Sequence, residues 1–217
     1  MTNLSGSIDC LFRQYAVFDE SNMVRQPQNS SLEEASTLTC AATTSWNAPY
    51  GLKPGKSWRR SSRARQWWLK HFCVTAVGAM VVATTSSTAK ASRLKELGAD
   101  HVIHYREDAN WGQIAKSLTT HGEGFGRTIE VDGAATMKQS FAAVKVEGVI
   151  SIIGLFRRCN STWLRGIVVS SKEMMQDTVD AIEDYNVHPV LERPLFPEAY
   201  KHLRVGSHFG KVVIQIA

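Results

Sequence analysis

The segment Thr84–Lys90, which reads TTSSTAK, combines small hydroxyl side chains with one cation and contains no acid. Hydroxyl groups and an ammonium group both donate hydrogen bonds to anionic oxygens, so Ser86 and Lys90 are candidates for binding a phosphate group. An alternative reading needs no ligand. Ser86 and Ser87 would then only begin a helix, and Lys90 would be a solvated surface charge.

The residues around this segment predict a strand, a helix and a second strand in close succession. Met80–Ala83 is a short apolar run suited to a strand that is covered on both faces. Ser87 can cap the helix that follows, Gly98 can end it, and Val102–Ile103 begins the next strand. Such a unit implies a parallel sheet with a right-handed crossover, and these sheets bind ligands at the carboxyl ends of their strands.

Strand and helix patterns alternate along most of the chain, which predicts an α/β fold with a doubly wound parallel sheet. A capping box at Ser31 and Glu34 begins an alanine-rich segment that can form a helix as far as Ala48. The other expected elements are a helix over Trp111–Leu118, a strand over Arg127–Val131, a helix over Thr136–Val144, strands over Gly148–Gly154 and Gly166–Val169, and a capped helix over Ser171–Tyr185.

Composition excludes several classes of protein. The four cysteines, Cys10, Cys40, Cys73 and Cys159, have no short paired spacing, so they indicate neither a disulfide scaffold nor a zinc site made of cysteines alone. The N-terminus lacks the pattern of a secretory signal, and the apolar runs are too short to span a bilayer. We therefore expect a cytoplasmic protein with no membrane partner.

The net charge of +5 comes from one stretch that contains no acid. Aromatic residues lie between the cations of this stretch, a combination that can stack bases and neutralise phosphates. Nucleic-acid binding nevertheless ranks low, because the stretch has no clear period that would place these side chains on one face. The seven cations are Lys53, Lys56, Arg59, Arg60, Arg63, Arg65 and Lys70, and the aromatic residues are Trp58, Trp67, Trp68 and Phe72.

Long, ordered blocks of this sequence resemble the medium-chain dehydrogenase/reductase superfamily, in particular the zinc-type alcohol dehydrogenase-like and quinone-reductase-like oxidoreductases. The resemblance implies a Rossmann-like domain, a nicotinamide cofactor, and hydride transfer to or from a carbonyl, an alcohol or an activated alkene of a small-molecule substrate. It also makes a homodimer possible. The blocks are SLEEASTLTCAATTSWNA, GLKPG, VVATTSS, RLKELGADHVIHYREDANWG, IEVDGAATMKQSFAAVKVEGVISIIGL, LRGIVVSS and HFGKVVIQIA.

The resemblance also implies which residues bind the cofactor. Ser86 and Lys90 would lie near the adenosine 2′-phosphate and Tyr105 near the adenine, and Thr85 would also bind the cofactor. NADP is therefore the expected cofactor, with NAD as the alternative. Two further pairs, Val131 with Gly133 and Gly154 with Leu155, would border the nicotinamide. Taken alone, both glycines would more often be turn residues than cofactor contacts. Catalytic residues are not identifiable from the sequence.

No zinc is expected, although Cys40 aligns with a position that supplies a zinc ligand in true zinc alcohol dehydrogenases. A catalytic zinc ion needs three protein ligands, and the other ligands of the family belong to a domain that is missing from this chain. We therefore interpret Cys40 as a buried structural cysteine on the alanine-rich helix.

Relative to the family, the chain is expected to divide into three parts. Residues 1–29 would be a remnant of the chaperonin-10-like catalytic domain, residues 30–186 the Rossmann-like domain, and residues 187–217 a segment that returns toward the catalytic domain. Such a truncated chain would have little or no activity, because its hydride-transfer site would be open to water. A non-catalytic remnant is the alternative function.

The stretch 56–73 is atypical for the family, which has a first strand and a glycine-rich turn here. This chain has no glycine at these positions. A reading-frame error in the gene model and a genuine basic loop both account for the difference. In either case we expect the stretch to pack poorly and not to form a proper first strand, because a central parallel strand is normally apolar on both faces.

Overall fold

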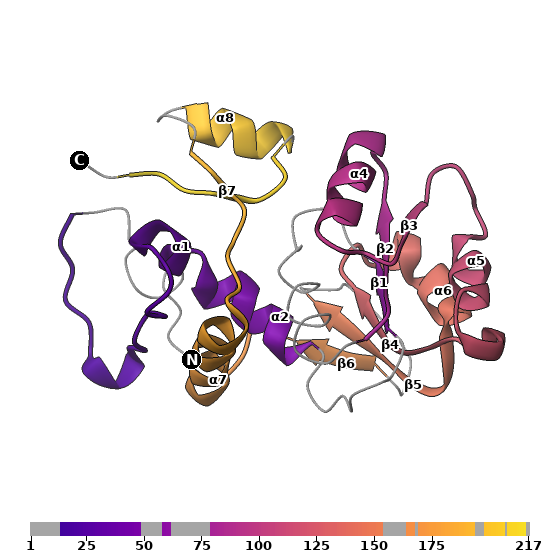
Figure 1. Ribbon diagram of the computed structural model, residues 1–217, viewed down its shortest axis with the longest axis horizontal. Helices are drawn as coiled ribbons and strands as arrows, with labels where there is room; N and C mark the ends of the chain where they lie inside the picture. The colour runs from indigo at the N-terminus through magenta and orange to yellow at the C-terminus, as the bar shows by residue number, and fades with distance from the viewer. Residues whose placement is uncertain are drawn as a thin grey trace.

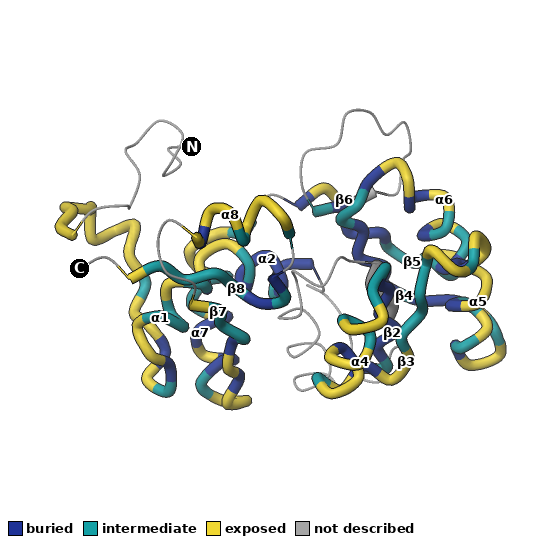
Figure 2. Tube along the Cα trace, turned by 90° about the horizontal axis from the view of Figure 1, so that it is seen from above, coloured by how far each residue is buried: buried dark blue, intermediate teal, exposed yellow. Residues whose placement is uncertain are grey.

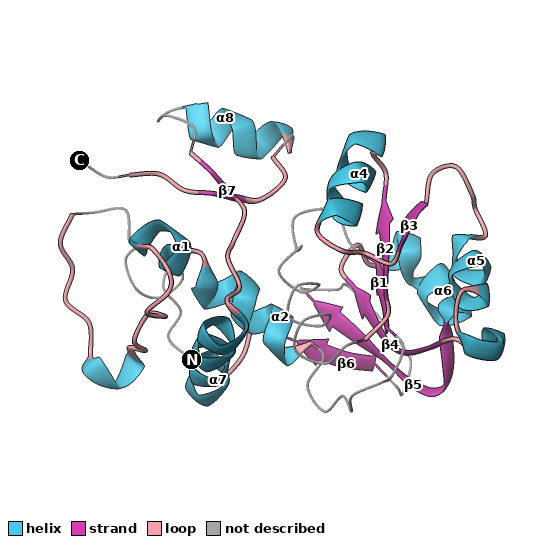
Figure 3. Cartoon of the chain, in the orientation of Figure 1, coloured by secondary structure: helices cyan, strands magenta, loops and turns pink. Residues whose placement is uncertain are grey.

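The computed structural model describes residues 14–48, 58–61, 79–153, 164–167, 169–193, 198–206 and 208–215. Two groups of elements lie side by side along the long axis of the molecule (Figures 1 and 3). A parallel sheet with its covering helices forms one group. The N-terminal helices, α7 and the C-terminal segment form the other.

The main sheet has six strands in the order β3-β2-β1-β4-β5-β6, and every pairing in it is parallel. Chain order reverses between β1 and β4, so the sheet has a topological switch point there. This arrangement confirms the predicted α/β fold. The strands are β1 (Trp58–Ser61), β2 (Val81–Thr85), β3 (His101–His104), β4 (Phe125–Glu130), β5 (Val144–Ile153) and β6 (Leu164–Ile167).

Strand β2 shows why the sheet is covered on both sides. All five of its residues are buried, and successive side chains alternate between the two faces of a strand. Val81 joins a cluster with Ala48 and Ile129, whereas Val82 joins a different cluster with Ala115 and Phe125. The strand is therefore apolar on both faces, as is usual for a strand of a parallel sheet that is covered on both sides.

Helices cover both faces of the sheet (Figure 1). On one face, Leu94 of α4 packs against Ala83 of β2. On the other face, Ala115 of α5 and Ala143 of α6 pack against Phe125 of β4. The helices are α4 (Thr88–Glu96), α5 (Trp111–Ser117) and α6 (Ala134–Ala143), with a short 3-10 turn, η4 (Thr120–Gly122), after α5.

The predicted capping box is present at the N-terminal helix. The Ser31 hydroxyl accepts from Glu34 N at 3.2 Å, and the Glu34 carboxylate accepts from Ser31 N at 2.8 Å. The segment is not one regular helix. It consists of α1 (Leu32–Ser36), a π-helical turn η2 (Leu38–Ala42) and α2 (Thr43–Asn47), and a 3-10 turn, η1 (Glu20–Asn22), precedes it.

Threonine hydroxyls explain the interruption. Thr43 Oγ1 donates to the carbonyl oxygens of Leu38 and Thr39, and Thr37 Oγ1 donates to that of Glu34. Hydroxyl groups that bond to main-chain carbonyls one turn earlier compete with the regular helical ladder and distort it. The sequence predicted that this segment is helical, but it did not predict the π-helical turn between the two α-helices.

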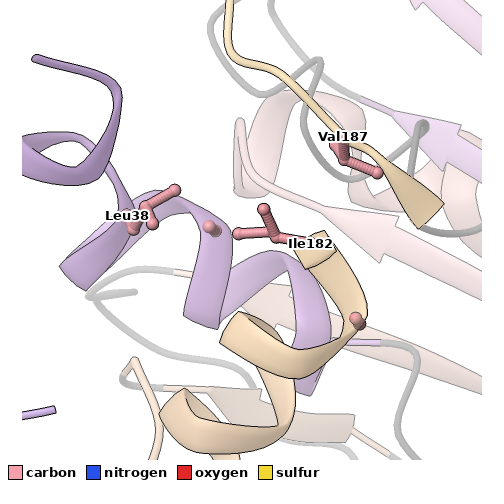
Figure 4. Packing of buried hydrophobic residues seen from close by; sticks show 5 residues of the cluster. Leu38, Ile182 and Val187 are labelled. Atoms are coloured by element: carbon pink, nitrogen blue, oxygen red, sulfur yellow. The ribbon is translucent and has the colours of Figure 1, made fainter. Parts of the chain in front are cut away.

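A second hydrophobic core lies away from the sheet, between η2 and α7 (Lys172–Tyr185) (Figure 4). Leu38 from η2 and Ile182 from α7 are almost fully buried, and Val187 closes the cluster. The Ser171 hydroxyl caps α7 by accepting from Met174 N at 3.3 Å. The predicted helix over Ser171–Tyr185 is therefore confirmed.

The C-terminal segment adds a small parallel sheet. It consists of β7 (Leu191–Glu192), α8 (Glu198–Val205) and β8 (Lys211–Val212), with Leu191 paired to Lys211. Burial falls off away from the cores (Figure 2). In the N-terminal segment, Tyr15 and Val17 are almost fully exposed. The three-part domain division stays a prediction.

The prediction that residues 56–73 form no proper first strand is wrong for Trp58–Ser61. These residues form β1, which pairs in parallel with β2 on one side and with β4 on the other. Parallel pairing requires only main-chain N–H and C=O groups, so the cations of this segment do not prevent it. The rest of the stretch lies outside the described residues.

Candidate functional site

The candidate site lies along the carboxyl edge of the main sheet. Because all the strands are parallel, the residues that follow them emerge at this same edge. Ser86 follows β2, Tyr105 follows β3 and Val131 follows β4. Ligands of open parallel sheets bind at this edge, close to the switch point.

The ends of β2 and β3 are tied together. Thr85 is buried, and its carbonyl oxygen accepts from Tyr105 N at 3.0 Å. Thr85 Oγ1 also accepts from Ser87 N at 3.2 Å, which shapes the turn that contains Ser86. The structure therefore brings Thr85, Ser86 and Tyr105 together. Binding of an adenosine group by these residues stays a prediction.

Lys90 lies in the first turn of α4, the helix that Ser87 caps. Its ammonium group donates to Gly206 O at 3.4 Å and to His208 O at 3.3 Å. Lys90 is thus partly buried against the C-terminal segment and is not a freely solvated charge. An ammonium group has three N–H donors, so these two bonds leave a third for an anionic oxygen.

A carboxylate holds the C-terminal loop that contacts Lys90. Glu192 Oε1 accepts from Phe209 N at 2.6 Å, and Glu192 Oε2 pairs with His202 Nε2 at 2.5 Å. Burial alone would raise the pKa of Glu192, but the hydrogen bonds from Phe209 N, from the His202 ring and from Gly210 N outweigh it, and the pKa lies below its ordinary value. The C-terminal loop is therefore held by hydrogen bonds to both Glu192 and Lys90.

Val131 and Gly133 lie beyond the end of β4. Val131 is half-buried beside the cluster that contains Ile129. Gly133 is buried and has φ 84° and ψ −138°, a conformation that side-chain-bearing residues rarely adopt. This geometry explains why a glycine is needed at position 133. Gly154 and Leu155, the other predicted nicotinamide neighbours, lie outside the described residues.

No role was predicted from the sequence for Glu130, the last residue of β4. Its side chain is fully buried, and Asp132 N, Gly133 N and the hydroxyls of Thr136 and Ser140 all donate to it. The sequence contains a spacing from which this arrangement could have been predicted. Thr136 and Ser140 are four residues apart, so they share a face of the helix that follows the buried carboxylate.

The described part of the chain contains neither a metal-binding cluster nor a helix that is long and apolar enough to cross a membrane. Cys40 is exposed, so its interpretation as a buried cysteine is wrong. Leu38 and Ala42 are the buried residues of the π-helical turn, and Cys40 lies between them on its outer side.

The described residues of this edge are suited to binding. They present hydroxyl groups, one ammonium group, and the main chain close to a glycine, which can hold a phosphate and a flat ring. A model of the zinc-binding dehydrogenase family matches residues 71–192. This chain belongs to that family.

Named relatives agree with this assignment. A zinc-type alcohol dehydrogenase-like protein of Schizosaccharomyces pombe is 36% identical over 247 residues, which cover 98% of this chain and 68% of the relative. The solved structure of a Sinorhizobium meliloti protein described as an alcohol dehydrogenase has a TM-score of 0.89 and 31% identity, and the match covers 99% of this chain and 67% of that one. The chain thus spans about two thirds of the length of these relatives.

A second solved structure, of an NAD-dependent alcohol dehydrogenase, has a TM-score of 0.83 and 25% identity, with 96% of this chain and 66% of that chain covered. The predicted resemblance to the medium-chain oxidoreductases is therefore confirmed.

Proposed function

We propose that the chain is the cofactor-binding part of an NADP(H)-dependent oxidoreductase that acts on a small molecule. The bound cofactor would supply the hydride that is transferred to or from a carbonyl, an alcohol or an activated alkene. The observation that carries the proposal is the Lys90 ammonium, held at the end of β2 by Gly206 O and His208 O.

The chemistry of the β2 end favours a phosphorylated adenosine. NAD-binding members of this fold class use a carboxylate after the second strand to bind the ribose 2′-hydroxyl, and an acid there would repel a 2′-phosphate. Thr84–Lys90 contains no acid. The Ser86 hydroxyl and the third N–H of Lys90 would donate to the phosphate, with Thr85 supporting the turn and Tyr105 beside the adenine.

The β4 end would hold the nicotinamide. Gly133 has no side chain, so the flat ring can approach its main chain closely, and Val131 offers an apolar contact. Gly154 and Leu155 complete this group by resemblance to the family. The similarity to an NAD-dependent alcohol dehydrogenase keeps NAD as the alternative cofactor.

Fragments of the cofactor provide a test that does not depend on the pyrophosphate or the nicotinamide. We would titrate the chain with 2′,5′-adenosine bisphosphate and with 5′-AMP by isothermal calorimetry. The first should bind at least about tenfold more tightly, because a phosphate that pairs with a cation gains about 1.5–3 kcal/mol. Equal affinities would contradict the assignment of NADP. Titration with NADPH and NADH extends the comparison to the intact cofactors.

A cytoplasmic location and a homodimer, which composition and family resemblance imply, remain part of this proposal. Analytical ultracentrifugation of the purified chain tests the second of these. A single species at the 24.1 kDa mass of the chain would contradict the dimer.

A further inference from the structure

We propose that Glu130 is a positioning residue for the nicotinamide, and that its buried charge favours the oxidised form of the cofactor. The proposal rests on the proposed function, because it concerns the same cofactor at the other end of the site. Glu130 would have two effects: it would hold the shape of the turn that carries Gly133, and it would favour binding of the oxidised cofactor over the reduced one.

The buried Glu130 carboxylate accepts hydrogen bonds from the turn between β4 and α6. Its Oε1 accepts from Asp132 N at 2.9 Å, from Gly133 N at 3.0 Å and from Thr136 Oγ1 at 2.6 Å, while Oε2 accepts from Ser140 Oγ. All four groups donate to it, which is the pattern of bonds that an ionised carboxylate makes. One side chain thus fixes two amides of the turn and two hydroxyls of the helix.

The turn depends on this carboxylate for its shape. Gly133 stands at the N-terminal boundary of α6, where a side-chain cap normally satisfies free amides, and α6 has no such cap. Glu130 Oε1 instead accepts from the amide of Gly133 itself, the residue at that boundary. Losing the carboxylate would free the turn that carries Val131 and Gly133, the two predicted neighbours of the nicotinamide.

None of the four described donors neutralises the charge of Glu130. All four donors are uncharged groups, and the side chain has no exposed surface. The residue ends β4, which pairs with β1, so it lies beside the switch point. Charges act over longer distances in a protein interior than in water.

Oxidised and reduced nicotinamide differ in charge at the ring. The oxidised ring is positively charged and the reduced ring is neutral, so a nearby fixed negative charge binds the oxidised ring more tightly. Glu130 would therefore raise the affinity for NADP⁺ relative to NADPH.

The test compares Glu130→Gln with the parent chain. We would measure dissociation constants for NADP⁺ by calorimetry and for NADPH by fluorescence, and amide exchange at Asp132 and Gly133 by NMR. We expect weaker binding of both nucleotides, faster exchange at both amides, and a loss of about fivefold in the preference for NADP⁺ over NADPH. The control is Glu123→Gln, which removes the same charge from an exposed residue before β4 and should leave the preference unchanged.

Thr136→Val separates position from charge, and it serves if Glu130→Gln does not fold. It removes one donor and keeps the carboxylate, so binding of both nucleotides should weaken by the same factor. An unchanged preference in Glu130→Gln, or unchanged binding in Thr136→Val, would overturn the inference. If the parent chain bound neither nucleotide while the two amides still depended on Glu130, the proposed function would fail and Glu130 would be a structural residue only.

Discussion

Lys90 and His208 are 118 positions apart in the sequence, yet the Lys90 ammonium donates to the His208 carbonyl at 3.3 Å. The bond joins α4 to the C-terminal segment. The proposed adenosine end of the candidate site would therefore be built from two parts of the chain. A substitution in either part should therefore alter nucleotide binding at the proposed site.

Lys90→Glu should weaken NADPH binding by about 10- to 100-fold, because it removes a donor to the 2′-phosphate and adds a repelling charge. NADH lacks that phosphate, so its affinity should change by less than about threefold. Fluorescence titration of both nucleotides provides the measurement. Lys95→Glu, at an exposed position of the same helix, is the control and should change neither affinity. Equal weakening of NADPH and NADH by Lys90→Glu would show that Lys90 acts through the C-terminal loop.

The Glu192 contacts predict that acid destabilises the C-terminal sheet. Burial opposes ionisation, but hydrogen bonds lower the pKa of Glu192 below its ordinary value of 4.5. Such a group stabilises the fold above the pKa of the unfolded chain, and this contribution is lost as pH falls through the folded pKa.

Urea unfolding of the parent and of Glu192→Gln tests this sign. The parent should be the more stable of the two at about pH 6, and the difference should shrink as pH falls below about 4. Comparison of the two proteins at each pH removes the contribution of the other carboxylates. A difference that stayed constant over this range would contradict the prediction.

Ile182→Ala should destabilise the chain by about 2–5 kcal/mol, because it removes a fully buried side chain and leaves a cavity beside Leu38 and Val187. Leu32→Ala is the matched control. Leu32 is 76% exposed, so its truncation should cost less than about 0.5 kcal/mol. Urea unfolding followed by tryptophan fluorescence measures both values, and similar losses in the two variants would be unexpected.

The chain should show little turnover by itself. We expect this because the described residues of the carboxyl edge offer hydroxyl, ammonium and main-chain groups, which suit the binding of a cofactor. A panel of aldehydes and quinones with NADPH, followed by absorbance of the reduced nicotinamide, provides the assay. Rates like those of full-length relatives would contradict this prediction and would rule out a non-catalytic remnant.

Local signals predicted the central unit of the fold. The buried run of β2, the cap at Ser87 and the left-handed Gly98 are each readable from adjacent residues, and the structure has all three. Pairing between distant residues was harder to predict. Strand β5 begins at Val144, four residues before the expected Gly148, because Val144 pairs with Phe125 and a register shift follows.

The candidate site, like the fold, could be predicted from the sequence only in part. Tyr105 directly follows β3, and its amide donates to the carbonyl of Thr85, the last residue of β2, because the two strands are a parallel pair. Resemblance to the family, rather than sequence spacing, assigned both residues to the cofactor, and that assignment stays a prediction. The contacts of Lys90 with the C-terminal loop depend on how α4 and that loop pack, and no sequence spacing encodes this. The strand at Trp58–Ser61 was missed for a related reason, because main-chain pairing depends little on side-chain polarity.

Phe209 packs against two separate clusters, one that contains Ile182 and one that contains Leu94 of the sheet-covering helix α4. A single aromatic ring near the C-terminus therefore links the two cores thermodynamically. Heat should melt them in one cooperative transition rather than in two steps. Phe209, close to the C-terminus, would thus cause the two cores to unfold together.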